Sequence, residues 1–289
     1  MNRMTRELSS AAHTVNRLQL DVVAAMASRV PELSACGAIA RQHDPDRFLC
    51  ALFAPADRRE ALFTLIAYNH ELARAREVAS NPMVALIRIT WWREAVEQAL
   101  AGTPARQHEV AAPLHQAIRD GVLDAEGLIG MADAREAEAE EEGIASTSAL
   151  HAYLRGTAGG FAVVAGRLLG APPALLPGLQ LAGMLFGLAG VLRAVPALAA
   201  QGRSLLPRDL VEPEAVIADP HAADGAIRTL AAGAAAPPDL RALPRAAIAA
   251  ALPLTLARRD LRRLAAGREV HRGLGDRLAV LIAAQRGRP

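Results

Sequence analysis

The sequence predicts an all-α fold, and three observations carry that prediction. Apolar residues recur with the 3.6-residue period of a helix along the whole chain, the strict alternation of a half-buried strand is absent, and β-branched runs are short. Apolar residues make up 52% of the 289 positions, which is enough for one continuous core. The chain has no internal repeat and no clean boundary, so we expect a single domain over residues 1–289.

Start and stop signals predict the individual helices. One begins after Pro55 and runs to about Val78, and one side of it carries a stripe made of Leu62, Ile66, Asn69, Ala73 and Arg76. The pair Asn81-Pro82 caps the next helix, which ends near Leu100. Further helices are expected at about 107–120, 124–141, 147–169, 174–200, 221–233, 244–266 and 275–286.

The stretch 174–192 is long and apolar enough to cross a membrane, but Pro177 and Gly178 interrupt its start and three further glycines dilute it. We therefore expect a buried core helix rather than a membrane span. Residues 1–20 lack the apolar stretch of a secretory signal and contain Glu7. A transit peptide stays open, and no basic amphipathic helix of clear moment stands out.

Charge and cysteine usage exclude several classes of function. The chain has 32 basic residues, all of them arginine, and 30 acidic ones, a balance that argues against an electrostatic nucleic-acid binder. Cys36 and Cys50 lie fourteen apart without a CxxC or a histidine pair, which predicts neither a zinc site nor a disulfide and favours a reducing compartment. His70-Glu71 lacks the second histidine of a zinc protease. The glycines of 156–160 lie in a predicted helix and favour close helix packing over phosphate binding.

Four phrases in order carry a family resemblance: DPDRFLCALFAPADRREALFTLIAYNHELARARE, IRITWWREAVE, AYLRGTAGGFAVVAGRLLG and GVLRAVPALAAQGRSLLPRDL. Together they resemble the squalene/phytoene synthase family over about residues 46–210. The resemblance implies an isoprenoid-synthase-type helical bundle around a central cavity, in which two prenyl diphosphates are joined head to head. It also implies two aspartate-rich motifs on facing helices, whose carboxylates hold Mg²⁺ ions that bridge to the diphosphate.

This sequence departs from both motifs. The first falls on residues 73–77, with Ala73, Arg74 and Glu77 at its acidic positions, so one carboxylate remains of three. The second falls on residues 190–198 and keeps no carboxylate; its positions include Arg193, Ala194 and Leu198. From Gly143 to Arg208 there is no aspartate or glutamate at all. We therefore expect no metal site and no catalytic residue on these two helices.

Arginines and glutamates near these positions allow two interpretations. Guanidinium groups can grip a phosphate without a metal, and the candidates are Arg74, Arg76, Arg193 and Arg203. The alternative is that the first three pair at the surface with Glu71, Glu77 and Glu94.

The acidic stretch 133–143, with Glu138, Glu141 and Glu142, is interpreted as a solvated face paired through Asp124 and Arg135, and a displaced metal site is its alternative. Of Trp91 and Trp92, we expect one ring in the core and the other over a neighbour, the alternative being a ring in the cavity.

Three functions follow, in order of preference. The LRAVP phrase resembles the branch related to a mitochondrial complex I assembly factor, which implies a non-catalytic protein that works with subunits or assembly proteins of a membrane respiratory complex. The second is a divergent prenyl transferase, the only one that would require Mg²⁺. The third is a carrier of an isoprenoid or lipid phosphate, for which the cavity volume is decisive. All three fit a cytoplasmic protein, peripheral at the inner membrane, or a matrix protein if the source is eukaryotic, and none involves nucleic acid.

Overall fold

The computed structural model describes residues 33–79, 81–140 and 143–289. The N-terminal segment and both Glu141 and Glu142 lie outside the described residues. Ala35–Pro289 forms one unit by its internal contacts. The expectation of one domain over the whole chain stays a prediction.

The described residues form helices and connecting loops, with no strand among them, so the predicted all-α class is confirmed. The α-helices are α2 (Ala35–His43), α3 (Pro45–Ala51), α4 (Ala56–Glu77), α5 (Pro82–Ala101), α6 (Ala111–Arg119), α7 (Ala125–Arg135), α8 (Thr147–Leu154), α9 (Gly160–Leu168), α10 (Leu176–Ala199), α11 (Pro213–Ala218), α12 (Asp224–Ala232), α13 (Ile248–Ala251), α14 (Pro253–Ala265) and α15 (Leu274–Arg286). Short helical turns are η1 (Glu136–Ala139), η2 (Arg155–Gly159), η3 (Pro173–Leu175), η4 (Pro220–Ala223) and η5 (Arg245–Ala247).

The ends of α5 show how local chemistry sets a helix. Asn81 is extended, and its side-chain oxygen accepts a hydrogen bond from the Val84 N–H at 3.0 Å, with Pro82 at the first helical position. Gly102 ends the helix in the left-handed region, with φ of 71°, where a side chain would be strained. Both signals are visible in the sequence, and the predicted bounds are correct to within a residue or two.

The predicted continuous helix 147–169 is instead α8 and α9 joined by the π-helical turn η2. Glycines in and opposite this turn allow neighbouring helices to approach closely. A Cβ on Gly156 would lie 2.4 Å from the Cβ of Ala134, and one on Gly183 would lie 2.3 Å from the carbonyl oxygen of Ala158. The glycine-rich segment therefore serves helix packing, as the sequence predicts.

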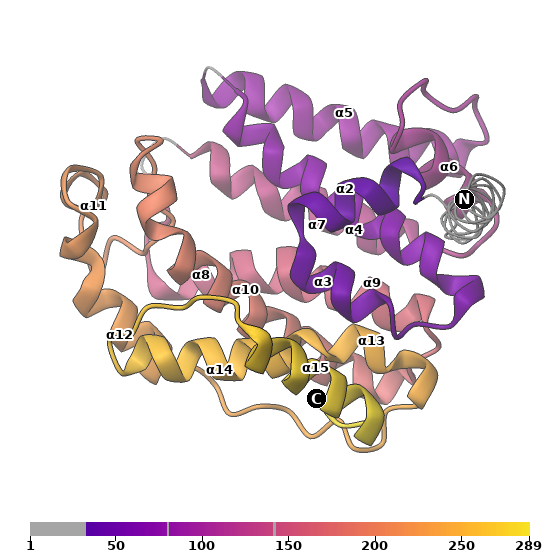
Figure 1. The fold of residues 1–289 in the computed structure, drawn as a ribbon. Helices are drawn as coiled ribbons and strands as arrows, with labels where there is room; N and C mark the ends of the chain where they lie inside the picture. Colours follow the sequence, from indigo (N-terminus) through magenta and orange to yellow (C-terminus); the bar gives the residue numbers. More distant parts are fainter. Residues whose placement is uncertain (1–32, 80, 141–142) are drawn as a thin grey trace, which may run out of the picture. The chain divides into compact units, whose positions relative to one another are not determined.

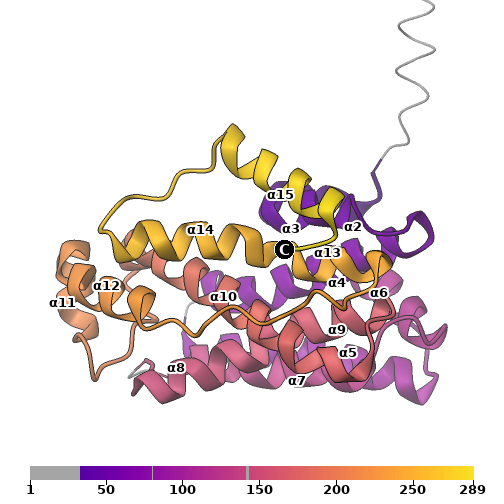
Figure 2. The same cartoon turned by 90° about the horizontal axis from the view of Figure 1, so that it is seen from below.

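Helix α10 is the central core helix of this unit. It contacts α14, α9 and η2, and none of residues 179–195 is exposed. In Figures 1 and 2, α5 lies on one side of α10, and α14 and α15 lie on the opposite side. The span Pro173–Ala199 passes a test for membrane-crossing length and apolarity, yet its burial among other helices is that of the predicted core helix.

The two tryptophans belong to the packing between α5 and its neighbours. Trp92 is buried and meets the Tyr68 ring edge to face, with ring centroids 5.8 Å apart. Trp91 packs against Trp92, and the Arg106 guanidinium covers its outer face at 4.6 Å. One ring is in the core and the other covers a neighbour, as predicted, and neither is among the residues that line the central cleft.

Candidate functional site in the central cleft

A cleft of about 520 Å³ opens between α4 and α10. Its walls also include the junction of α2 and α3, the turns η1 and η2, and two arginines from later loops. The sequence-predicted motif positions that line it are Ala73 and Glu77 of α4 and Arg193, Ala194 and Leu198 of α10. The fold therefore brings the two degenerate motifs to face one cavity, as the resemblance implies.

The residues at these positions do not fit a magnesium site. Ala73, Ala194 and Leu198 present hydrocarbon to the cleft, and Glu77 is the only motif carboxylate there. Mg²⁺ needs several hard oxygen ligands in octahedral geometry. Among residues 33–79, 81–140 and 143–289, no group of three or more His, Cys, Asp or Glu side chains is placed to hold a metal ion. The cleft therefore does not supply the set of oxygen ligands that a magnesium-dependent reaction requires.

Asp46, Arg193 and Arg272 line the cleft and meet the buried Asp260 behind them, and we call these four charged side chains the Asp260 cluster. The Arg272 guanidinium donates to Asp46 at 2.7 Å and to Asp260 at 2.6 Å. Arg193 lies 3.6 Å from Asp46 and 3.5 Å from Asp260, whose side chain is completely buried. Burial works against the charge of Arg272, but its hydrogen bonds to Asp260 and Asp46 outweigh it and raise the pKa of Arg272. Two aspartates and two arginines thus neutralise one another.

A second cluster, the Glu138 cluster, also lines the cleft. Glu138 is held by Arg135 at 2.5 Å and Arg203 at 3.1 Å, and it accepts a hydrogen bond from the Tyr153 hydroxyl at 2.7 Å. Burial raises the pKa of Tyr153, so its hydroxyl keeps the proton that it donates. Arg135 also donates to Asn69 of α4 at 3.3 Å. The cluster therefore connects η1, α4, α8 and the loop after α10.

The predicted solvated face is wrong for Glu138, whose side chain is only 5% exposed. The predicted pairing with Arg135 is correct, and Asp124 pairs instead with Arg167. The reason for the error is geometric: after Arg135 the chain tightens from α7 into the 3₁₀ turn η1, which ends the α-helical period, and Arg203 reaches Glu138 from 65 residues further on. Local charge density gives no signal of such a partner.

At what we call the inner end of the cleft, Arg47 lines both the cleft and a small adjoining space. Its guanidinium lies over the rings of Phe161 and Phe186, 4.2 and 4.7 Å from their centroids, and donates to Asp44 at 2.7 Å. The space beyond Arg47, lined by small and apolar side chains such as Ala182, has a volume of only about 10 Å³. A space of that size does not admit a prenyl chain.

The four arginines suggested as phosphate ligands do not gather at one place. Arg193 and Arg203 line the cleft, whereas Arg74 and Arg76 do not. Arg74 pairs with Glu71 at 3.7 Å, as the surface-pairing interpretation expects. That interpretation is wrong for Arg193, which pairs with Asp46 and Asp260 rather than with a glutamate of α4 or α5. The proposed phosphate role stays untested.

Among the described residues, His70 and the two cysteines are uncharged near neutral pH. The rings of His43 and His70 stack at 4.0 Å beside the cleft. Burial, then the neighbouring His43 and Arg74, lower the pKa of His70 to about 4, so it is neutral at pH 7. Cys36 and Cys50 are buried thiols; burial raises the pKa of Cys36 to about 11 and raises that of Cys50 as well. Neither thiol is ionised near neutral pH.

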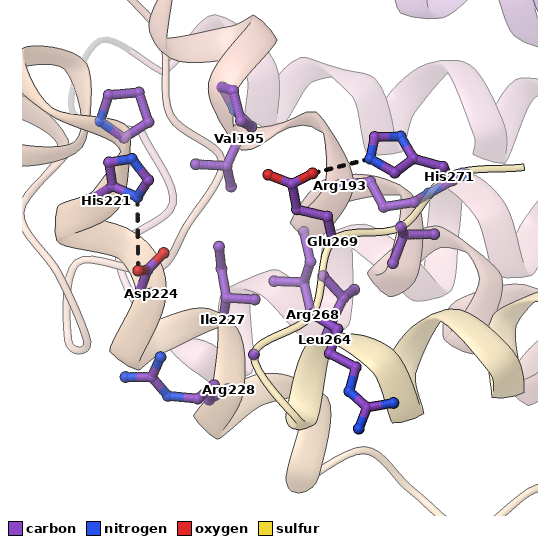
Figure 3. Close-up of a pocket in the computed structure, with 15 residues that line it drawn as sticks. Arg193, Val195, His221, Asp224, Ile227, Arg228, Leu264, Arg268, Glu269 and His271 are labelled. Carbon is purple, nitrogen blue, oxygen red and sulfur yellow. Dashed lines mark hydrogen bonds and ion pairs between the residues drawn. The ribbon is translucent and has the colours of Figure 1, made fainter.

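A second groove, also of about 520 Å³, lies between α10, α12 and the end of α14 (Figure 3). Arg193 lines both this groove and the cleft. Apolar side chains such as Ile227 and Leu264 line the groove, and carboxylate–imidazole pairs lie along it, including Glu269 with His271 at 2.9 Å. Leu192, Arg193, Val195 and Pro196 of the second degenerate motif line this groove, and no residue of the first motif does.

Comparisons with known proteins agree with this geometry. The squalene/phytoene synthase family model matches residues 40–281. The chain is similar to a Homo sapiens protein called NADH dehydrogenase (ubiquinone) complex I, assembly factor 6, with 30% identity over 122 residues, which cover 42% of this chain and 36% of that protein. The Bos taurus protein of the same name is 27% identical over 176 residues, covering 61% of this chain and 53% of that protein. The matched regions thus span about a third to a half of the length of these curated relatives.

Two solved structures share the fold. A dehydrosqualene synthase in complex with a ligand superposes with a TM-score of 0.63 at 12% identity, covering 86% of this chain and 94% of that chain. A squalene synthase from Alicyclobacillus acidocaldarius superposes with a TM-score of 0.56 at 17% identity, covering 88% and 94%. At these identities the likeness concerns the fold alone, and it confirms the predicted isoprenoid-synthase type of helical bundle.

Proposed function

This chain belongs to the squalene/phytoene synthase family, and from that premise we propose that it is a non-catalytic member that acts in the assembly of a membrane respiratory complex of the complex I type. Its partners under this proposal are subunits or assembly proteins of that complex, at the cytoplasmic or matrix side of the inner membrane. The cleft is then a structural element of a binding protein rather than a reaction chamber.

The observation that carries the proposal is the content of the cleft. Departure of a diphosphate requires positive charge that is free to bind it, supplied by metal ions or by unpaired cations. Here the facing motif positions hold mostly hydrocarbon, and Arg193, Arg203 and Arg272 are already held by carboxylates of the same chain. A diphosphate entering the cleft would have to displace Asp46, Asp260 or Glu138 from these arginines.

The closed inner end argues against a lipid carrier. A carrier needs an apolar chamber for the chain of its ligand, as pockets that bury most of a ligand do. The guanidinium of Arg47 stands between the open cleft and the residual space of about 10 Å³. The role in assembly is favoured over both alternatives by the relatives, which carry the name of a complex I assembly factor.

One experiment separates assembly from catalysis. Deletion of the gene in its native host is expected to lower the NADH dehydrogenase activity of the membranes and the amount of assembled complex in native gels. Both readouts are expected to be restored by the wild-type chain and by a variant in which Ala73 and Ala194 are changed to leucine, which fills the motif positions with hydrocarbon. Restoration by that variant would be incompatible with metal-dependent catalysis at these positions.

The matching test in vitro uses the purified chain with Mg²⁺ and farnesyl or geranylgeranyl diphosphate. We expect no release of pyrophosphate above the rate without protein. Release that depends on protein and is abolished by Glu138→Gln, but unchanged by Arg74→Gln outside the cleft, would overturn the proposal in favour of a divergent prenyl transferase. An unaltered respiratory complex in the deletion strain would overturn the assembly role.

A further inference from the structure

Helix α15 has a buried inner face and, on its other side, an apolar face that the described structure leaves exposed. Its inner face is buried through Asp276, Val280 and Ala283. Its outer face carries a second stripe at helical spacing, and these side chains are 78%, 55%, 39% and 44% exposed in the order Leu274, Leu278, Leu281 and Ile282. Figure 2 shows α15 on the side of α14 away from α10, at the border of the ribbon. This outer leucine stripe is an apolar patch that a soluble helix would normally fill with polar residues.

Ion pairs hold the helix in this orientation. The Asp276 carboxylate accepts from Arg259 at 2.7 Å and from Arg263 at 3.0 Å, and it also accepts from the Gly273 N–H at the start of the helix. Burial opposes ionisation of Asp276, but the hydrogen bonds from Arg263 and Arg259 outweigh it and lower its pKa to about 2. The polar anchor therefore points inward and the leucines point outward.

The C-terminal part of the chain, which includes α15, is strongly positive in sequence. Residues 241–289 contain 11 arginines and three carboxylates, although the whole chain has nearly equal numbers of basic and acidic residues. Two of the three carboxylates, Asp260 and Asp276, are buried and paired with arginines. Helical geometry places the exposed Arg277 and Arg286 on opposite flanks of the stripe, and neither has an ion-pair partner among the described residues.

We propose that the outer leucine stripe of α15, with Arg277 and Arg286 beside it, docks the protein on the surface of an anionic lipid bilayer. Leucine and isoleucine side chains enter the boundary between headgroups and acyl chains, and flanking arginines reach the lipid phosphates. The size of the stripe favours a bilayer over a protein: a helix of 13 residues is about 20 Å long and about 10 Å wide, on the order of 200 Å². A stable protein interface buries about 800 Å² on each partner.

The test is flotation of the full chain with vesicles. We expect binding to phosphatidylcholine vesicles that contain phosphatidylglycerol to be at least about tenfold tighter than binding to phosphatidylcholine alone, and to weaken with salt. The double variant Leu278→Glu, Ile282→Glu is expected to lose at least about tenfold in affinity, because it removes the buried apolar area. Arg277→Gln and Arg286→Gln are each expected to lose about fivefold.

A matched control uses two equally exposed apolar side chains on α5, Met83 and Ile87, which are 64% and 62% exposed. The variant Met83→Glu, Ile87→Glu is expected to bind vesicles within about twofold of wild type, and thermal unfolding checks that all variants fold. Equal loss in this control, or unchanged binding by the α15 variant, would overturn the proposal. So would a dimer of the wild-type chain in light scattering that Leu278→Glu dissolves while no vesicle binding is seen. Pyrophosphate release and respiratory assembly do not enter these readouts, so this test stands apart from the proposed function.

Discussion

Replacement of Asp260 by asparagine tests the view that the cleft is held by its own ion pairs. The carboxylate is completely buried, and it bonds Arg272 at 2.6 and 2.7 Å and lies 3.5 Å from Arg193. Asparagine keeps the shape but removes the charge, so the guanidinium groups of Arg272, Arg193 and Arg263, the last at 3.9 Å, lose a buried counterion. Removal of one partner of a buried pair typically costs about 3–5 kcal/mol. At about 2–4 °C per kcal/mol for a domain of this size, the melting temperature is expected to fall by roughly 6–20 °C.

The measurement is thermal unfolding followed by circular dichroism, with Asp239→Asn as the control. Asp239 also bonds an arginine, Arg241, at 2.6 Å, but both side chains are exposed, so no resolvable shift is expected. In the double variant Asp260→Asn, Arg272→Met, the second change is expected to recover part of the loss, because it removes the unpaired charge. A fall of less than about 2 °C in Asp260→Asn would refute the argument.

Two further predictions concern acid stability and the closed chamber. Asp276 has a pKa of about 2 against an ordinary 3.8, so its ionised form adds about 2 kcal/mol to the free energy of unfolding above pH 4. This contribution is lost as the pH falls towards 2. Urea unfolding at a series of pH values is expected to show the loss in wild type and not in Asp276→Asn. Arg47→Ala is expected to join the residual space to the cleft, and this variant should bind farnesol or a fluorescent apolar dye that wild type does not bind. The control variant Arg106→Ala, which removes a similar contact over Trp91, is expected to bind neither. Equal dye binding by both arginine variants would contradict the role of Arg47 in separating the cleft from the residual space.

Much of this fold could be predicted because its signals are local. Asn81-Pro82 and Gly102 mark the ends of α5 in the sequence itself, and the glycines of η2 mark a close approach of helices. That Ala73 and Ala194 face one cleft was indicated by the order of the four sequence phrases that carry the family resemblance. Each phrase alone is a weak signal, and only their order makes the resemblance specific. What the family resemblance implies about the scaffold is confirmed by the shared fold.

The contents of the cleft could not be predicted in the same way. Arg272 meets Asp46 across 226 positions and Arg203 meets Glu138 across 65, and no pattern of period 3.6 links residues so far apart. Both arginines come from loops, for which spacing predicts no direction. The sequence does not reveal the docking face of α15 for a related reason. Asp276 and the leucines are all compatible with an ordinary helix, and only the tertiary contacts show which face of that helix is covered.

The two ion-pair clusters also explain how the charges of the cleft are balanced within the chain. A cavity built for diphosphate and metal balances its charges only when both are bound, and arginines left without them would be desolvated and repel one another. Here the chain supplies the balance itself, with Asp46 and Asp260 facing Arg193 and Arg272. These contacts join the first turn of α3, the C-terminal part of α10, the middle of α14 and the loop before α15. Charges that a catalytic cavity would direct at its substrate therefore stabilise the tertiary structure of this chain. Such stability suits a protein that acts through its surface rather than through its cavity.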